Sequence, residues 1–107
     1  MKLIIAIINH DDVGTVTQNL SKKGFSSTRL STTGGFLMAG NVTLLIGVED
    51  EKVQAVMDII REYSHSRKQI IPTASEMTYG YIPTMPVEVT VGGATVFVVD
   101  VERFERL

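Results

Sequence analysis

Apolar and polar positions change their period several times along the chain, and each period predicts one element. Residues 2–8 (KLIIAII) form a dense apolar run, which is typical of a strand covered on both faces. Residues 9–12 are polar and can cap a helix. Apolar side chains then recur at helical spacing, at Val13, Val16 and Leu20. The pattern predicts a central strand and then a helix over about residues 11–23, which ends at Gly24.

The middle of the chain predicts two more strands and a second helix. Residues 25–32 have β-type composition, residues 33–35 break it, and residues 41–48 are rich in Val, Leu, Ile and Thr. Asp50 is a suitable N-cap, and the acidic Glu51 suits the first turn of a helix. One apolar stripe at helical spacing follows, formed by Val53, Val56, Met57, Ile60 and Tyr63. These signals predict a helix that begins after Asp50.

The last third of the chain contains a long segment without a regular period. Residues 70–86 hold all three prolines and two of the three tyrosines, so we expect a long loop. Such a loop in a short chain is either functional or disordered, and its apolar and aromatic side chains argue against simple disorder. Residues 87–91 and 94–101 flank Gly92 and Gly93, a spacing typical of a tight β-hairpin.

The predicted order is β-α-β-β-α-β, with an extra strand that forms a hairpin with the last one. This order is typical of an α+β, ferredoxin-like fold, and we expect residues 1–107 to form a single domain. Two helices then cover one face of an antiparallel sheet. Strands as apolar as residues 3–8 and 95–99 cannot leave their other side in water at low cost. We therefore expect self-association to cover the second face.

Composition and charge narrow the range of functions. The chain has 107 residues, of which 44% are hydrophobic, and a net charge of −2 with basic residues scattered along its length. Without a positive stripe, a nucleic-acid polymer is not an expected partner, whereas one small anionic ligand needs only a few local donors. No run approaches the roughly 18 apolar residues of a membrane span, so we expect no membrane insertion and a cytoplasmic protein.

Catalytic and metal chemistry find little support in the residues. The chain has no cysteine, which excludes disulfides, thiolate metal sites and cysteine nucleophiles. His10, Asp11 and Asp12 are consecutive, so their side chains diverge, and we interpret them as the capped start of a helix. No serine lies in an activating motif. We therefore expect no enzyme activity, no catalytic residue, no metal site and no cofactor.

Residues 32–41 combine hydroxyls, glycines, an aromatic ring and an amide in one short segment. Glycine lets backbone N–H groups approach a ligand, Phe36 can stack on a base, and Asn41 can pair with an adenine edge. The alternative is a glycine loop in which Phe36 anchors the segment to the core. From the chemistry of these residues alone, both interpretations stay open.

Two longer stretches resemble one known family. Residues 30–50 (LSTTGGFLMAGNVTLLIGVED) and 86–98 (PVEVTVGGATVFV) closely resemble the PII-like cyclic-di-AMP receptors of the PstA/DarA type. The resemblance implies a PII-like homotrimer that binds cyclic di-AMP between its subunits, has no catalytic activity and signals to an unknown downstream protein. The positions that contact the ligand in the family correspond here to Thr28, Gly35, Phe36, Leu37, Asn41, Gly47 and Phe97.

Two departures from the family pattern define an alternative. Ser26 stands where the family typically has an arginine two residues before Thr28, and Met38 stands where an arginine often precedes Ala-Gly-Asn. The leading hypothesis is a trimeric receptor for cyclic di-AMP. The alternative is a PII-like scaffold that has lost this ligand and acts through protein contacts or through another adenine nucleotide.

Overall fold

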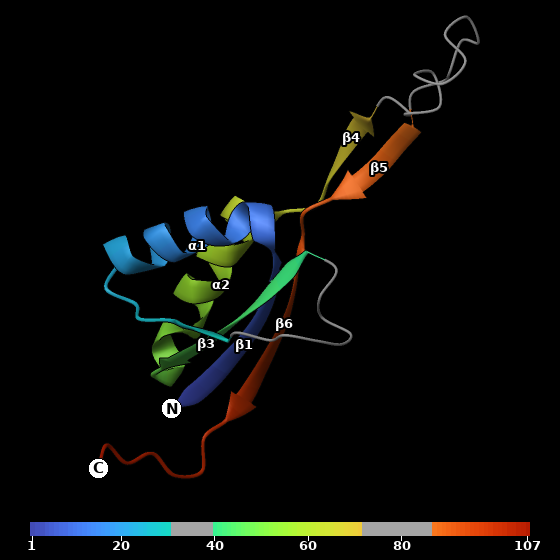
Figure 1. The fold of residues 1–107 in the computed structure, drawn as a ribbon. Helices are drawn as coiled ribbons and strands as arrows, with labels where there is room; N and C mark the ends of the chain where they lie inside the picture. Colours follow the sequence, from blue (N-terminus) through green and yellow to red (C-terminus); the bar gives the residue numbers. More distant parts are fainter. Residues whose placement is uncertain (31–39, 72–86) are drawn as a thin grey trace, which may run out of the picture.

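The computed structural model describes residues 1–30, 40–71 and 87–107 (Figure 1). Its elements, in chain order, are β1 (Lys2–Asn9), α1 (His10–Lys22), β2 (Thr28–Leu30), β3 (Asn41–Val48), the 3₁₀ helix η2 (Asp50–Lys52), α2 (Val53–Ser64), β4 (Arg67–Ile71), β5 (Val87–Val91) and β6 (Ala94–Asp100). The helices and strands predicted for the first 64 residues are confirmed, although some of their ends differ by a few positions.

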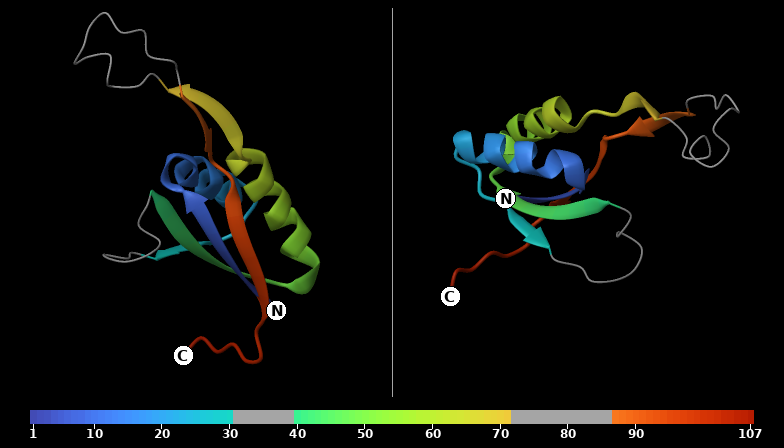
Figure 2. Two further views of the ribbon diagram at one scale, coloured as in Figure 1. Left: turned by 90° about the vertical axis from the view of Figure 1, so that its right-hand side faces the viewer. Right: turned by 45° about the horizontal axis from the view of Figure 1, so that its top comes forward.

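Four strands form an antiparallel sheet in the order β2-β3-β1-β6. β1 pairs along its whole length with β3 on one side, and along nearly all of it with β6 on the other. Because β3 lies between the parallel strands β1 and β2, the sheet has the split βαβ arrangement of a ferredoxin-like fold. Both helices cover one face of this sheet, as the sequence predicted (Figure 2).

The core lies between the sheet and the two helices. Alternate residues of β1 point to this side, and Ile4, Ala6 and Ile8 are completely buried there. The other members of the core include Val16 and Leu20 from α1, Leu44 and Ile46 from β3, and Val56 and Ile60 from α2. The two-residue period of the strands and the 3.6-residue period of the helices thus meet in one buried layer.

Two hydrogen bonds fix the first turn of α1. The side chain of Asn9 accepts a hydrogen bond from the N–H of Asp11 at 2.9 Å, which caps the helix. The N–H of His10 donates to the carbonyl of Gly40 at 2.6 Å, which ties the start of α1 to the start of β3. The predicted helix start over residues 10–12 is confirmed.

The start of α2 differs from the prediction. Asp50 is not the N-cap of α2, because residues Asp50–Lys52 form η2 and α2 follows at Val53. The carboxylate of Asp50 lies 3.0 Å from the amino group of Met1 instead, and this hydrogen bond lowers the pKa of Asp50. A charged donor binds a carboxylate more strongly than a helix N–H does, which explains why the ammonium group engages this side chain.

The strands β4 and β5 form a separate antiparallel ladder, here called the arm, which extends away from the sheet and the helices (Figure 1). The sequence analysis placed Ile70 in a loop, whereas it lies in β4 opposite Glu88. β5 exists as predicted, but it pairs with β4 and forms no hairpin with β6. Gly92 and Gly93, with φ of +78° and +83°, carry the chain from the arm into the sheet.

The hairpin prediction was wrong for a physical reason. β6 pairs with β1 through one edge only, so that pairing does not exclude a hairpin, whereas β5 takes β4 as its partner and leads away from the sheet. The polar start of β4, Arg67-Lys68-Gln69, gave no strand signal in the sequence.

Ile4→Ala should lower the free energy of unfolding by about 2–5 kcal/mol, because Ile4 is 0% exposed in the central strand. Urea unfolding followed by circular dichroism measures the loss. The matched control is Ile70→Ala in the arm, where the side chain is 68% exposed and the loss should be much smaller. Equal losses at the two positions would contradict this assignment of the core.

Candidate functional site

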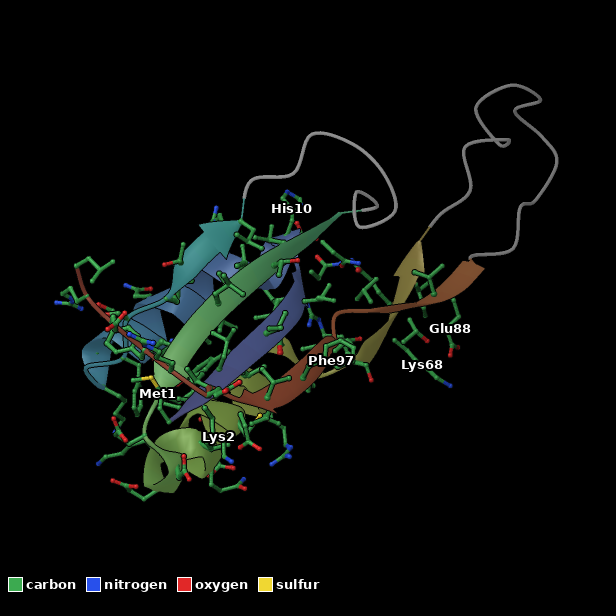
Figure 3. The ribbon with its side chains drawn as sticks, turned by 90° about the horizontal axis from the view of Figure 1, so that it is seen from below. Met1, Lys2, His10, Lys68, Glu88 and Phe97 are labelled. Carbon is green, nitrogen blue, oxygen red and sulfur yellow. The ribbon has the colours of Figure 1, made fainter. Side chains whose placement is uncertain are left out.

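A row of side chains crosses the face of the sheet opposite the helices, here called the open face. Thr28 in β2 lies opposite Leu45 in β3. Leu45 lies opposite Ile5 in β1, and Ile5 lies opposite Phe97 in β6. Their neighbours in β1 and β3 are buried against the helices, so strand alternation turns this row away from the core. Figure 3 views the sheet from below, with Phe97 labelled on β6.

Four of the seven residues predicted to contact a ligand lie on the open face. Thr28 and Phe97 belong to the row, and Asn41 and Gly47 share the face because each is an even number of residues from Leu45 in β3. Thr28, Asn41 and Gly47 are exposed, and Phe97 is 53% exposed. The other three, Gly35, Phe36 and Leu37, lie outside the described residues, as does Met38.

These four residues are spread widely over the face. Thr28 and Phe97 are three strand spacings apart, which corresponds to roughly 14 Å. Asn41 and Gly47 are six residues apart along one strand, which corresponds to roughly 20 Å. One compact ligand therefore cannot touch all four residues of a single copy.

The open face carries no charged side chain on the strand residues that the structure describes. By strand register its members are Leu3, Ile5, Ile7, Asn9, Thr28, Leu30, Asn41, Thr43, Leu45, Gly47, Thr95, Phe97 and Val99. Arg29 in β2 lies opposite Leu44, whose side chain is buried on the helix side, so Arg29 belongs to the other face. The described strand residues of the open face thus offer apolar contacts, stacking, hydroxyls and amides, and none of them is cationic.

β6 is an edge of the sheet, and its outer side has no strand partner among the described residues. Phe97, Val98 and Val99 remain 53%, 41% and 41% exposed. Native proteins normally shorten, charge or cover such long apolar edges. The open face and this edge together form the apolar surface for which the sequence analysis expected self-association.

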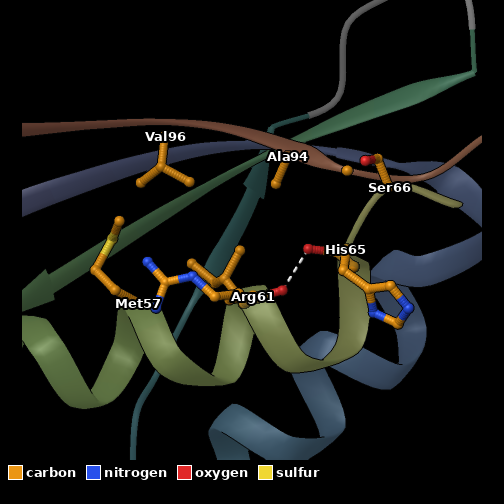
Figure 4. Close-up of a pocket in the computed structure, with 9 residues that line it drawn as sticks. Met57, Arg61, His65, Ser66, Ala94 and Val96 are labelled. Atoms are coloured by element: carbon orange, nitrogen blue, oxygen red, sulfur yellow. Dashed lines mark hydrogen bonds between the residues drawn. The ribbon is translucent and has the colours of Figure 1, made fainter.

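A cavity of about 550 Å³ lies on the helix side of the sheet, between α2 and β6 (Figure 4). Its walls include the apolar Met57, Ile60 and Val96 and the polar Arg61, His65 and Ser66. Val96 and Phe97 are consecutive in β6, so their side chains point to opposite faces. The cavity contains none of the predicted ligand residues and is a separate surface from the open face.

The polar side chains at the start of α1 point to different partners. His10 and Asp11 form an exposed pair at 3.3 Å, whereas Asp12 turns toward Arg67. The residues that the structure describes contain no group of three potential metal-binding side chains. Within the same residues, no helix is long and apolar enough to cross a bilayer.

Sequence reasoning missed the ion pair between Asp12 and Arg67. Asp12 is 8% exposed and accepts hydrogen bonds from Arg67 at 3.0 and 3.3 Å. These hydrogen bonds to the Asp12 carboxylate raise the pKa of Arg67. Asp12 was interpreted only as part of a helix start, and it lies 55 positions from Arg67. No pattern in a single sequence connects two such residues.

Fold and site together define a small ferredoxin-like α+β protein whose candidate ligand face has no charged side chain on its described strand residues. The family described as cyclic-di-AMP receptor matches residues 1–107, the whole chain. The chain therefore belongs to the cyclic-di-AMP receptor family, and the resemblance predicted from the two sequence stretches is confirmed.

A solved structure is similar over nearly the whole chain. It is the crystal structure of a functionally unknown protein from Pediococcus pentosaceus ATCC 25745, with 40% sequence identity and a TM-score of 0.76. The match covers 99% of this chain and 96% of that chain. This similarity supports the predicted ferredoxin-like fold class.

Proposed function

We propose that this protein is a receptor for cyclic di-AMP, which binds the nucleotide between the subunits of a homotrimer and signals to a downstream protein. The observation that carries the proposal is the position of Thr28, Asn41, Gly47 and Phe97 on one open face. Membership of the cyclic-di-AMP receptor family supports the chemical class of the ligand. The protein acts by binding, and no catalytic step is part of the proposal.

The spread of these residues favours a pocket between copies. Asn41 and Gly47 lie roughly 20 Å apart along β3, a long distance for one small ligand to span on a single copy. In a pocket between subunits, part of the set comes from one copy and the rest from its neighbour. These residues lie on the same apolar open face for which we expect self-association. Assembly and ligand binding would therefore use one surface.

Each residue has a role that suits its chemistry. Phe97 provides an aromatic wall for a base, and Thr28 and Asn41 provide a hydroxyl and an amide for polar contacts. Gly47 is not required by the fold of one copy, because a Cβ atom there would meet nothing within 4 Å and its φ is not positive. A glycine at such a strand position is typical of close approach by a ligand or another backbone.

One observation favours the alternative, a scaffold of this family that has lost cyclic di-AMP and acts through protein contacts or another adenine nucleotide. The described strand residues of the open face include no cation for the two phosphates, and the exposed Ser26 does not supply one. Loss of one charge-assisted hydrogen bond to phosphate weakens binding by about 1.5–3 kcal/mol, or roughly tenfold to more than a hundredfold.

Titration calorimetry with cyclic di-AMP, cyclic di-GMP and ATP tests the proposal, and we expect cyclic di-AMP to bind most tightly. Phe97→Ala should weaken binding by roughly tenfold, because an aromatic stacking contact contributes about 1–3 kcal/mol per base. The matched control is Phe104→Ala, since Phe104 is 61% exposed and lies outside the sheet. Absence of cyclic-di-AMP binding, or equal affinities of the two variants, would contradict a pocket on the open face.

Sedimentation velocity should show a trimer at micromolar concentration, because the described residues of one copy place no helix or second sheet over the apolar open face. Leu45→Lys places a charge in the middle of this face and should shift the protein toward the monomer. Gln69→Lys adds the same charge to the exposed surface of the arm and should leave the trimer intact. If the parent protein is a monomer, both the trimer and the pocket between subunits are contradicted.

Ser26→Arg should strengthen cyclic-di-AMP binding, and the gain should shrink at high salt. β2 begins at Thr28 and not at residue 25 as expected, so strand alternation does not fix the direction of Ser26. Its exposed position still allows a long guanidinium side chain to reach a phosphate near Thr28. Screening over about 8–10 Å at ordinary ionic strength gives the salt dependence.

Ser21→Arg is the control for this substitution, because it adds the same charge at an exposed position of α1. Calorimetry at low and high salt compares the two variants. If Ser26→Arg raises the affinity for cyclic di-AMP no more than Ser21→Arg does at low salt, the phosphates do not lie near Thr28. The alternative function then replaces the receptor.

A further inference from the structure

One arginine at the base of the arm contacts the start of α1. Arg67 is the first residue of β4 and lies opposite Val91, the last residue of β5. Its guanidinium donates from Nη2 to Oδ1 of Asp12 at 3.0 Å and from Nη1 to Oδ2 of Asp12 at 3.3 Å. Nη1 also donates to the carbonyl of His65, at 3.3 Å. A two-pronged pair of this kind fixes direction as well as distance.

The Asp12 carboxylate belongs to a part of α1 that is hydrogen-bonded to the sheet. Asp12 lies in the first turn of α1, three residues after the cap at Asn9, and its side chain is only 10% exposed. Asn9 is paired with Asn41 in the sheet, and the N–H of His10 donates to the carbonyl of Gly40. The carboxylate therefore lies beside the end of β1 and the start of β3, whereas Arg67 belongs to the arm.

Gly92 leaves the space that the guanidinium occupies. A Cβ atom at position 92 would lie 2.5 Å from Nη1 of Arg67, 2.9 Å from the carbonyl oxygen of His65 and 3.2 Å from Oδ2 of Asp12. Any side chain there would displace one of these groups. Gly93 also has a positive φ, of +83°, but a Cβ atom there would meet Ser66 and not the ion pair.

We infer that Asp12, Arg67 and Gly92 form a clamp that holds the arm in one orientation relative to the core. Among the described residues, Asp12–Arg67 is the only salt bridge between the arm and the rest of the chain. The ion pair within the arm, Lys68–Glu88 at 3.2 Å, joins β4 to β5 (Figure 3). It does not connect the arm to the core. Breaking the clamp frees the arm while its ladder stays formed.

Because the chain has no cysteine, spin labels can be attached at two introduced cysteines to measure the orientation of the arm. Gln18→Cys on the exposed side of α1 and Gln69→Cys in β4 place one label on the core and one on the arm. Labelled protein diluted with unlabelled protein keeps the measured pair within one chain. Double electron–electron resonance then gives the distribution of distances between arm and core, and it requires no ligand.

The parent protein should give one narrow distance peak. Arg67→Gln, Asp12→Asn and Gly92→Ala should each lose this single peak and give a broad distribution. The double variant Asp12→Asn, Arg67→Gln leaves no unpaired charge at the site, and it should be as broad as either single variant because both act on one interaction. It also keeps the test valid if Arg67→Gln alone fails to fold.

Two matched controls should retain the narrow peak. Lys68→Gln removes the ion pair within the arm, and Gly93→Ala imposes the same type of backbone strain one residue from Gly92. A narrow peak in Arg67→Gln or in the double variant would overturn the inference. So would a broad peak in the parent or in either control. Because no nucleotide is present, these outcomes are independent of the calorimetric test of the proposed function.

Discussion

The pairing of β1 with a neighbour on each side is the constraint on which the rest of the structure depends. β1 is apolar on both faces, with Ile4, Ala6 and Ile8 toward the helices and Ile5 on the open face. Its own sequence therefore does not choose which face is buried. β3 makes the choice, because its alternation places Leu44, Ile46 and Val48 in the core and leaves Asn41 and Gly47 outside. The same register that builds the core also brings the candidate ligand residues onto one face.

The sequence predicted the elements whose apolar residues recur at a regular spacing. It missed the strand pairing that depends on residues far away in the chain. β1, α1, β3 and α2 follow from apolar spacing, and so does the split βαβ order. β4 has a polar start and no alternation at that end, so nothing local indicated its pairing with β5. Gly92 and Gly93 suggested a hairpin, although they form a passage between two sheets.

The candidate site shows the same division. Thr28, Asn41, Gly47 and Phe97 were predicted through the family resemblance, and strand register then placed them on one face. Ser26 and Met38 already predicted that two arginines are missing near the site, whereas the lack of charge on all the described strand residues of that face depends on the parity of every strand in the sheet. The pairing of Asp12 with Arg67 was not foreseen, since a contact across 55 positions is a property of the fold and not of a local pattern.

The two edges of the sheet are unlike each other. β2 offers three residues at one edge, whereas β6 offers seven, mostly apolar, at the other. A two-fold dimer uses the same patch twice, but a closed ring with an odd number of subunits needs a head-to-tail contact between two different patches. If the two patches include the β6 edge of one chain and the β2 edge of the next, each chain uses a different edge in each of its two contacts. Two chains damaged at opposite edges would then still share one intact contact, whereas two chains damaged at the same edge would share none.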